Sequence, residues 1–351
     1  MNKINDKILI NAQILRDFSF KLLKKINMDD KTSTFVTDSL VQSDLRGVDT
    51  HGVVRLPTYL KRFTTIEWKN SEVIKDDGVT ALIDGNNSPG QACAGKAMEL
   101  AIEKAERFGV GLVGVKNSNH FGTAAFYTMK AAEEGMVGLS FTNASPRLAP
   151  WGGKDPLLGN NPWSFAFPRR NGVPVAFDIS NSVVAAGKIR QASMKGEEIP
   201  IGWATDKEGS ATQNAEEALK GLLLPIGGHK GYGITLVVDI LSGILTGSGF
   251  ARQINGIDKT DSPQNVGHLL GAIKISNFIP YEEFLDRMDT MTSLIKNSER
   301  APGVEELYLP GEIEEKLCQE RLKHGIPIPQ KVIARLNEMA DELGVDRLVV
   351  N

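Results

Sequence analysis

The stretch AGKAMELAIEKAERFGVGLVGVKN, residues 94–117, decides between two possible folds for this chain. Its centre, Gly109 to Gly114, matches the G-x-G-x-x-G pattern of Rossmann folds, and Glu134 lies about 20 residues further on, where that pattern needs a ribose-binding acid. The match also requires a strand before the glycines and a helix that begins within them. Here a helical pattern precedes the glycines and a β-rich run follows. We therefore expect a helix cap followed by a strand, in a fold that is not Rossmann.

Outward from this stretch, short β-rich runs alternate with Gly, Pro and Asn turns between residues 73 and 277. Four helices are expected among these runs, at residues 90–108, 120–134, 215–221 and 232–250. Both chain ends carry apolar residues at helical spacing instead, in segments 14–26, 30–45, 284–295, 312–323 and 330–343. This order predicts an α/β body flanked by helices from both ends of the chain.

Composition narrows the classes of function. The chain has 351 residues, which is about the length of two domains, and 24% of its residues are charged, with a net charge of −3. The lack of a basic surplus argues against a nucleic-acid or anionic-membrane partner. Cys93 and Cys318 cannot form a disulfide framework, and we expect both to be small buried side chains in a reducing compartment.

No targeting or membrane segment is expected. The first 18 residues contain acids and no uninterrupted apolar run, so they do not resemble a secretory leader. The most apolar window, residues 232–250, carries Asp239 and lacks basic flanks at its C-terminal end. We expect this window to form a buried core helix rather than a membrane span, and the protein to be cytoplasmic.

The segment DLRGVDTHGVVRLPTY, which begins at Asp44, concentrates groups that carry chemistry. His51 titrates near neutrality and can move protons, Thr50 can orient its ring, and Arg55 can hold a carboxylate through two parallel hydrogen bonds. Together these groups suit an acid with an oxidisable hydroxyl, or its keto form. The structural alternative is that His51 caps a helix while Arg55 pairs with Asp44 or Asp49 on the surface.

The segment NSNHFGTAAFYTMKAAEE has the features of a helix start that binds an anion. Ser118 or Asn119 is expected to cap a helix that begins near His120, and Gly122 would let a ligand approach closely. The alternative is an ordinary capped helix with His120 at its boundary.

Two later segments combine charge with small residues. Asp178 ends a β-rich run, where a carboxylate is well placed for ribose hydroxyls, and Lys188 follows in a turn of small residues. In PIGGHKGYG, four glycines surround Lys230 ahead of the apolar window, which suits a phosphate or carboxylate but is not a Walker A motif. The alternatives are an ordinary strand end and a flexible entry loop.

A metal centre is not expected. The histidines, at positions 51, 120, 229, 268 and 324, form no i,i+4 pair, and the two cysteines do not complete a ligand set. No G-x-S-x-G motif is present, so an α/β-hydrolase nucleophile is not indicated either.

Taken together, these segments resemble the type-2 malate/L-lactate dehydrogenases and their ureidoglycolate, sulfolactate and diketogulonate oxidoreductase relatives. The resemblance covers most of the chain from Asp44 to Glu312. It rests on DLRGVDTHGVVRLPTYLKR, NSNHFGTAAFYTMKAAEEGMVGLSFTNASPRLAPWGG, LGNNPWSFAFP, FDISNSVVAAGKI, IPIGWATDKEGSATQNAEEAL, GGHKGYG, VGHLLGAI and LPGE. It implies a cofactor domain on a mixed, largely antiparallel sheet and a helical domain built from both chain ends. The implied cofactor domain is residues 73–277. The implied helical domain is residues 1–72 with 278–351, it takes part in dimerisation, and the implied assembly is a homodimer.

The resemblance also implies roles for individual residues. His51 resembles the family's proton donor and acceptor, with Thr50 where a serine usually stands, and His120 is the alternative base. The implied substrate residues are Arg55, Thr50, Asn161 and Lys188. The implied cofactor residues are His120, Phe121, Gly122, Asn143, Asp178, Ile179, Ser180, Lys230, Pro310, Gly311 and Glu312.

Three positions depart from the family pattern. Thr50 replaces a serine, Asn160-Asn161 replaces a Thr-Asn pair, and Gln213-Asn214 stands where Asp-Pro is common. None of these changes removes a group that the chemistry requires. The implied reaction is reversible oxidation of a small 2-hydroxy acid, malate first, with NAD or alternatively NADP as cofactor. Lactate, ureidoglycolate, sulfolactate, keto-sugar and cyclic-imine substrates stay open, as does a nucleotide-binding protein without catalysis.

Overall fold

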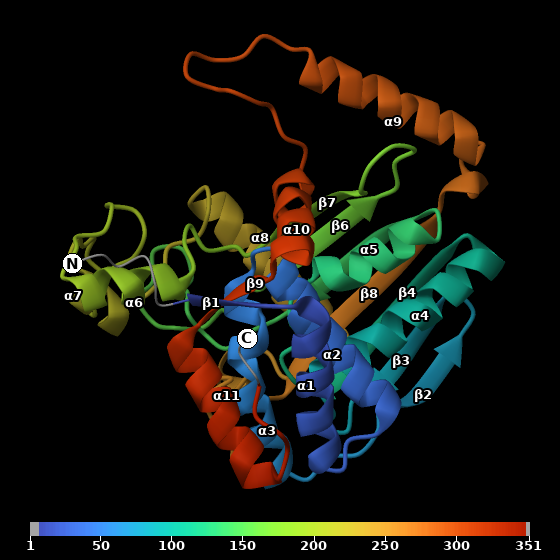
Figure 1. Ribbon diagram of the computed structural model, residues 1–351. Coiled ribbons are helices and arrows are strands. Elements are labelled where there is room, and N and C mark those ends of the chain that lie inside the picture. The colour runs from blue at the N-terminus through green and yellow to red at the C-terminus, as the bar shows by residue number, and fades with distance from the viewer. Residues whose placement is uncertain (1–6, 349–351) are drawn as a thin grey trace.

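The computed structural model describes residues 7–348, and its largest element is a seven-stranded sheet (Figure 1). The strands lie in the order β2 (Glu72–Asp77), β3 (Thr80–Asp84), β4 (Val110–Ser118), β8 (Val266–Lys274), β5 (Met136–Thr142), β6 (Trp163–Phe167) and β7 (Val175–Ile179). Within this sheet β3 and β4 pair in parallel and the other neighbours pair antiparallel. The prediction of an α/β fold on a mixed sheet is confirmed.

The glycine-rich stretch joins a helix to a strand, as predicted. Helix α4 (Gly90–Phe108) ends at Gly109, whose φ of 89° lies in the left-handed region and whose N–H donates to the Ala105 carbonyl at 2.8 Å. Strand β4 begins at the next residue. A methyl group on Gly111 would overlap the Ala101 carbonyl, so this glycine lets β4 lie against α4. The glycines therefore serve helix–sheet packing here.

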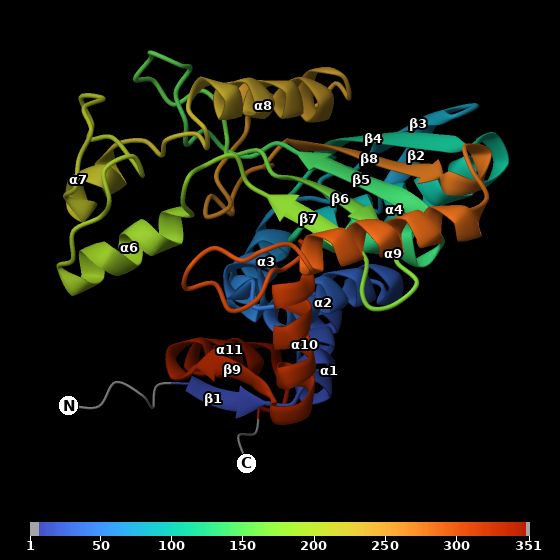
Figure 2. The same cartoon turned by 90° about the horizontal axis from the view of Figure 1, so that it is seen from above.

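Helices cover both faces of the sheet (Figure 2). Helices α4 and α5 (Ala125–Glu133) lie on one face, and α8 (His229–Asp239) with the π-helical turn Ile240–Ile244 lies on the other. The expectation that this apolar helix is buried all round is wrong, because Val237 is 53% exposed on its outer side. Within residues 7–348, no helix is long and apolar enough to cross a bilayer.

Both chain ends contribute to a second packed unit beside the sheet. Its helices are α1 (Ala12–Lys25), α2 (Asp30–Leu45), α3 (Leu56–Thr65) and α11 (Gln330–Leu343), and their apolar faces share one core with residues such as Leu22, Leu40, Leu60 and Leu336. Strand β1 (Lys7–Ile10) pairs antiparallel with β9 (Ile326–Pro329), a pairing that periodicity did not predict. Residues 1–6 and 349–351 of the predicted helical domain lie outside the described residues.

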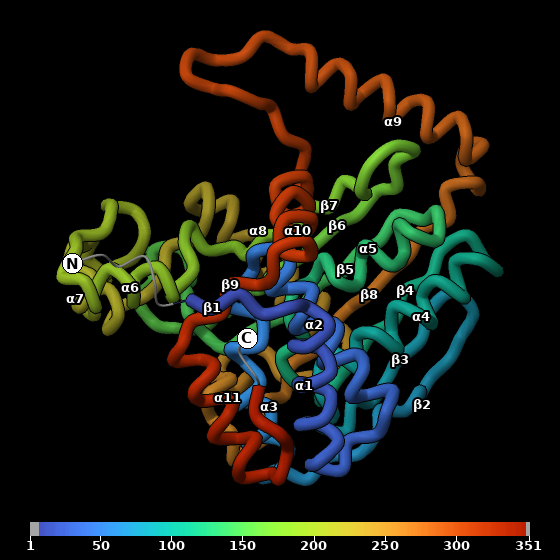
Figure 3. The backbone as a smooth tube through the Cα atoms, viewed as in Figure 1, coloured from blue at the N-terminus to red at the C-terminus, as the bar shows by residue number. Residues whose placement is uncertain are grey.

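After β8 the chain runs alongside the β6–β7 edge of the sheet before it joins that unit (Figure 1). Helix α9 (Tyr281–Lys296) lies beside the β6–β7 hairpin, where Arg170 pairs with Glu282 at 2.7 Å and with Asp286 at 2.6 Å. A long connection then leads to α10 (Glu312–His324), which contacts α2 (Figure 3). The β7–α8 connection forms a small lobe with α6 (Ala186–Lys195) and α7 (Ala215–Lys220).

The two cysteines are both free thiols, as expected for a chain without a disulfide framework. Cys93 is buried as predicted, at the start of α4. Cys318 on α10 is only half-buried, so the prediction of a buried side chain is wrong there.

Candidate active site

One pocket of about 290 Å³ lies where the end of α2, the start of α5 and the strands β6 and β7 come together. Five residues predicted for the site line it, namely Thr50, His51, Gly122, Asp178 and Ser180. The other lining residues are Gln42, Ser43, Arg46, Val48, Thr123, Ala124, Ala125, Phe126, Asn160, Pro162, Ala176, Ala185 and Glu314. The pocket thus combines a titratable ring, hydroxyls and small apolar side chains.

Hydrogen bonds made by the side chains of Asp44 and Arg321 hold the turn that carries His51. The Asp44 carboxylate is 2% exposed and accepts from the backbone N–H of Val53 at 2.8 Å. Arg321 of α10 donates to the Asp44 carbonyl and to the Asp49 carboxylate. The acids suggested as surface partners of Arg55 are therefore engaged by other groups, and the turn has a fixed shape.

Arg55 belongs to the same turn. Its Nε donates to the Thr50 carbonyl at 2.8 Å, and it does not line the pocket formed by the described residues. Its positive charge nevertheless lowers the pKa of both His51 and His120, so the guanidinium lies within electrostatic reach of both rings. An anion bound beside these rings would meet a cation.

Two imidazole rings stack beside the pocket, and of the two only His51 is among the described residues that line it. The centroids of His51 and His120 are 5.3 Å apart, with an angle of 24° between the planes. Thr50 Oγ1 lies 3.0 Å from His51 Nδ1, which leaves His51 Nε2 available to a ligand. His120 Nδ1 lies 2.7 Å from the Tyr59 hydroxyl and accepts from the Gly122 N–H at 3.4 Å. Because Nδ1 accepts, the ring proton of His120 lies on Nε2, and the Tyr59 hydroxyl donates to Nδ1.

Tyr59 was not identified from the sequence. It is buried, at 2% exposure, and lies on α3 eight residues after His51. A tyrosine in an amphipathic helix next to a loop histidine is ordinary core material, so local pattern alone could not mark it. The contact to His120 forms only when the α3 unit and the sheet come together.

Burial sets the protonation of both rings. Burial, together with the positive charge of Arg55, lowers the pKa of His51 to about 4. Burial and the neighbouring His51 hold the pKa of His120 well below its usual range. At neutral pH both imidazoles are therefore uncharged, which is the state in which a histidine can accept a proton.

The helix expected to begin near His120 begins five residues later, and its cap is different. Helix α5 starts at Ala125, after Gly122 turns the chain with a φ of 84°. The Asn119 amide donates instead to the carbonyls of Asn87 and Ser88, in the loop before α4. Asp178 at the end of β7 accepts from the Ala125 N–H at 2.8 Å, so a carboxylate from another element occupies the cap position.

Asp178 therefore lies in the pocket as predicted but already has a backbone partner. The Asp178 side chain is exposed to the pocket, but the surrounding protein removes enough water to raise the pKa of its carboxyl to about 6, against the hydrogen bonds from the Ala125 and Ala124 amides. Ser180 follows β7 and also lines the pocket, with its hydroxyl 3.4 Å from Ser182. Ile179, between them, is half-buried and is not among the described residues that line the pocket.

Several predicted residues are engaged within the protein. Phe121 is 1% exposed and stacks on His268 at 4.7 Å, with 7° between the planes. The Asn143 amide bonds Asp239, Gly249 and Gly267, and the Asn161 amide bonds Ala144 and Thr235. None of the three lines the pocket formed by the described residues, so their direct ligand roles stay predictions.

The predicted lysines are exposed. Lys230 lies in the first turn of α8, and Lys188 in the first turn of α6. Neither lines the pocket as the described residues form it. The start of α6 nevertheless faces the site, because a methyl group on Gly187 would lie 3.9 Å from the Thr50 methyl.

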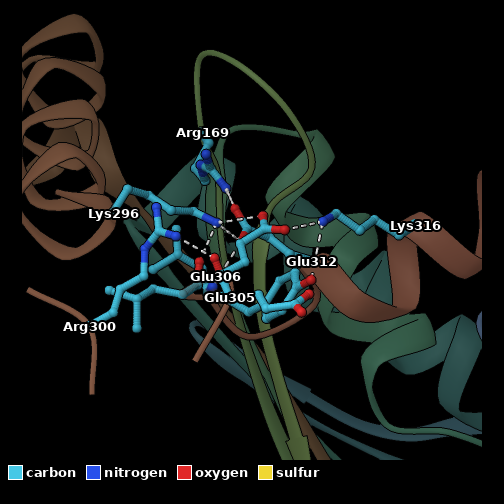
Figure 4. Close-up of polar contacts among 10 residues, drawn as sticks. Arg169, Lys296, Arg300, Glu305, Glu306, Glu312 and Lys316 are labelled. Carbon is cyan, nitrogen blue, oxygen red and sulfur yellow. Dashed lines mark hydrogen bonds and ion pairs between the residues drawn. The ribbon is translucent and has the colours of Figure 1, made fainter. Parts of the chain in front are cut away.

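The segment Pro310-Gly311-Glu312 lies directly behind the pocket wall. The Ala176 N–H donates to the Pro310 carbonyl at 3.0 Å, and Ala176 lines the pocket. The Glu312 carboxylate binds Arg169 at 3.1 Å, and it also binds Lys296, in a cluster of charges at the α9–α10 connection (Figure 4). This carboxylate anchors the returning chain, and its role toward a cofactor stays a prediction.

Arg46 and Glu314 are lining residues that the sequence did not single out. Arg46 ends α2 and is 7% exposed, with Nη contacts of 3.4 Å to Glu315 and to the Gly311 carbonyl. They come from α2 and α10, which are about 270 residues apart, so no local motif joins them. Among residues 7–348, no group of three or more metal-ligating side chains is present.

Comparison with known proteins agrees with this geometry. Residues 10–337 match the family model for malate/L-lactate dehydrogenase. The chain is 42% identical to the malate dehydrogenase of Pyrococcus abyssi over 347 residues, covering 96% of this chain and 95% of that protein. It is 31% identical to a ureidoglycolate dehydrogenase (NAD(+)) of Escherichia coli O157:H7, covering 91% and 92% of the two chains.

A solved structure extends this agreement to the fold. The sulfolactate dehydrogenase of Methanocaldococcus jannaschii superimposes with a TM-score of 0.92 at 36% identity, covering 97% of this chain and 98% of that one. Sequence and fold thus agree over nearly the whole length. The chain belongs to the malate/L-lactate dehydrogenase family of 2-hydroxy acid dehydrogenases.

Proposed function

We propose that the protein is an NAD-dependent oxidoreductase that interconverts malate and oxaloacetate. The observation that carries this proposal is the Thr50–His51 pair in the pocket wall, with Arg55 within electrostatic reach of the His51 ring. A 2-hydroxy acid needs a base for its hydroxyl proton and a cation for its carboxylate, and this turn carries both. The identity of 42% to a protein named malate dehydrogenase supports malate as the first substrate.

The pocket residues fit a nicotinamide nucleotide. The pocket wall includes the small side chains of Ala124, Ala125 and Ala176, which suit the close approach of a flat ring. Thr123 offers a hydroxyl, and the Asp178 carboxylate lines the pocket while accepting from the Ala125 N–H. The bound nicotinamide supplies the site that accepts or donates a hydride. We propose NAD as the cofactor, and NADP is tested in the same assay.

In this account each group of the turn has one task. His51 Nε2 accepts the hydroxyl proton during oxidation and returns it during reduction, while Thr50 holds Nδ1. A positioned base of this kind contributes about 10²–10⁴-fold in rate. Arg55 binds the substrate carboxylate, and orientation of bound reactants contributes at most about 7–11 kcal/mol. His120 lies behind His51, with its own Nδ1 held by Tyr59.

The test is consumption of NADH or NADPH, followed by absorbance, with a panel of keto acids. The panel contains oxaloacetate, pyruvate, 3-sulfopyruvate and oxalurate, the keto form of ureidoglycolate. The expected result is the highest kcat/KM with oxaloacetate and NADH. A higher value with another member would replace malate by that substrate, and no turnover with any member would favour a nucleotide-binding protein without catalysis.

Removal of the Tyr59 hydroxyl is expected to slow the reaction moderately. Tyr59→Phe deletes the donor to His120 Nδ1, and one hydrogen bond is worth about 0.5–1.5 kcal/mol, so kcat should fall about 3–10-fold. The matched control is Tyr281→Phe at the start of α9, which should leave kcat unchanged. Equal kcat values in both variants would remove Tyr59 from the working site.

The pH dependence of oxidation is expected to follow the lowered pKa of His51. The base must be uncharged, and burial with the charge of Arg55 lowers its pKa to about 4, so kcat/KM for malate oxidation should hold as pH falls through 6.5. Its acid limb should lie near pH 4. The measurement is kcat/KM for malate with NAD between about pH 4 and 8. A limb near the ordinary histidine pKa of about 6.5 would contradict this protonation state.

We also propose that the protein is a homodimer whose interface covers the outer side of α8, which lies in the cofactor domain and not in the helical domain to which the resemblance assigns dimerisation. Apolar side chains stand exposed there, including Val237 at 53%, Ile244 at 55% and Leu245 at 65%. Contiguous exposed apolar side chains mark interaction surfaces on soluble proteins. Light scattering is expected to give twice the chain mass of 38.2 kDa for the wild type, and the chain mass for Val237→Asp.

The control for this assembly is Met194→Asp, because Met194 is 80% exposed on α6, away from that helix. It should leave the mass doubled. A wild-type mass equal to one chain would overturn the dimer without touching the proposed chemistry.

We propose the division into residues 73–277 and residues 1–72 with 278–351 as two functional domains. The first would hold the cofactor and the second would supply His51. Separate apolar cores support this division, one with Leu22 and Leu336 and the other with Met98 and Leu270. The pocket lies between residues contributed by both parts, since it is lined by His51 and by Asp178.

A further inference from the structure

We propose that Arg62 is a positioning residue of the active site, which holds the loop of residues 254–265 so that Gln264 fixes the backbone of His120. The inference rests on the proposed function, because it concerns the histidine that stacks on the proposed base. It assigns a task to a buried charge that lies outside the pocket. Neither Arg62 nor Gln264 lines the pocket as the described residues form it.

Arg62 is a charge buried among carbonyl groups. It lies on α3 and is 1% exposed. Its Nη1 donates to the Ser262 carbonyl at 2.8 Å, and its Nη2 donates to the carbonyls of Ile257 and Lys259, both at 2.9 Å. A guanidinium has a planar fork of donors, and here it is spread over carbonyls of one loop. The loop therefore takes its shape around this side chain.

The same loop reaches the active site through Gln264. This side chain is 4% exposed, and its Oε1 accepts from the backbone N–H of His120 at 2.8 Å. Asn255 closes the loop at its other end, because its N–H donates to the Gln264 carbonyl at 3.0 Å and its amide donates to Pro263 at 2.8 Å. The position of the Gln264 side chain thus depends on the fold of the whole loop.

Helix α3 consequently holds His120 in two ways. Tyr59 binds the imidazole directly, at 2.7 Å from Nδ1. Arg62, one helical turn later, holds the loop whose Gln264 binds the His120 backbone. The positions of the His120 ring and of the His120 backbone therefore both depend on α3, the helix that follows the His51 turn. Within residues 7–348 no carboxylate lies at ion-pair distance from Arg62, and this task explains why a cation is buried there.

The test is a double-mutant cycle in kcat. Arg62→Lys keeps the charge but not the fork of donors, and Gln264→Met keeps the size but removes the acceptor. Each is expected to lower kcat for keto-acid reduction by about 10-fold or more with KM within about 3-fold, because misplacement of a site by about 1 Å can cost about 10²-fold. The double variant should lose no more than the worse single variant, because both act through one contact. Lys61→Ala, an exposed neighbour on α3, is the control and should keep the wild-type kcat.

The outcomes separate the proposal from its alternatives. Multiplied losses in the double variant would overturn it, as would unchanged kcat in Gln264→Met. A lower melting temperature of Arg62→Lys with wild-type kcat would leave Arg62 a structural residue only and also overturn it.

A second readout does not depend on activity. The His120 amide hydrogen should exchange with solvent at least about 10-fold faster in Arg62→Lys and in Gln264→Met than in Lys61→Ala, because its acceptor is released or removed. Unchanged exchange would overturn the positioning role. If the wild type reduces no keto acid, the proposed function fails, whereas the exchange experiment still decides whether Arg62 holds His120.

Discussion

Replacement of His51 by glutamine is expected to lower kcat for malate oxidation by about 10²–10⁴-fold, the contribution of a positioned general base. Glutamine preserves much of the volume and can still hydrogen-bond, so the turn below it should keep its shape. The chemical reason is the loss of Nε2, the ring nitrogen that faces away from Thr50. The measurement is steady-state kinetics together with NADH binding followed by fluorescence, which should change little.

The matched control is His324→Gln, because His324 is an exposed histidine at the end of α10. That variant should keep the wild-type kcat. The comparison with His120→Gln assigns the base. A larger loss in His120→Gln, with near wild-type activity in His51→Gln, would move the base to His120.

A methyl group at Gly52 is expected to damage both stability and activity. Gly52 has ordinary backbone angles, with φ −82° and ψ −156°, so strain in the backbone is not the reason. The reason is steric, because the added carbon would overlap the Asp44 carboxylate that accepts from Val53. Overpacking of a buried site costs about 1–3 kcal/mol. The shifted turn carries His51, so kcat should also fall by about 10-fold or more.

A double variant shows whether this clash is the cause. Asp44→Ala removes the overlapping atoms, so Gly52→Ala should destabilise the Asp44→Ala background less than the wild type. The control is Gly233→Ala on α8, where nothing lies within 4 Å of the added carbon and alanine favours the helix. The measurement is the melting temperature of each variant together with its kcat. Equal losses in both backgrounds would contradict the steric account.

Sequence patterns predicted the elements whose cause is local. Helices α2 and α11 begin and end where apolar periodicity and caps indicate. Gly109 was expected to end a helix and does so, because its left-handed φ is a property of that residue. The predicted start of α5 was wrong because the helix is capped by Asp178, a residue of β7 that lies 53 positions from Ala125. The prediction that α8 is a buried core helix was wrong for its outer side, because burial depends on whether another layer of the protein covers that side.

The residues of the candidate site likewise fall into those that a local sequence motif predicted and those that it did not. Thr50 and His51 were predicted because they stand side by side in one motif, and the structure places both in the pocket wall. Tyr59 was missed because its contact with His120 joins two separately packed parts of the molecule. Glu314 was missed because α10 reaches the pocket only through folding, whereas Arg46 stands in the same motif as His51 and was given no role from the sequence. Pattern identifies residues that act together when they are neighbours in sequence, and contacts made by folding lie beyond it.

A crystal structure with NADH and oxamate, an unreactive analogue of a 2-keto acid, tests the central claim most directly. The account predicts that the ligand oxygen equivalent to the substrate hydroxyl lies within about 2.6–3.2 Å of His51 Nε2, with the oxamate carboxylate on Arg55. An oxygen bound to His120 instead, or a His51 ring turned away from the ligand toward solvent, would contradict it.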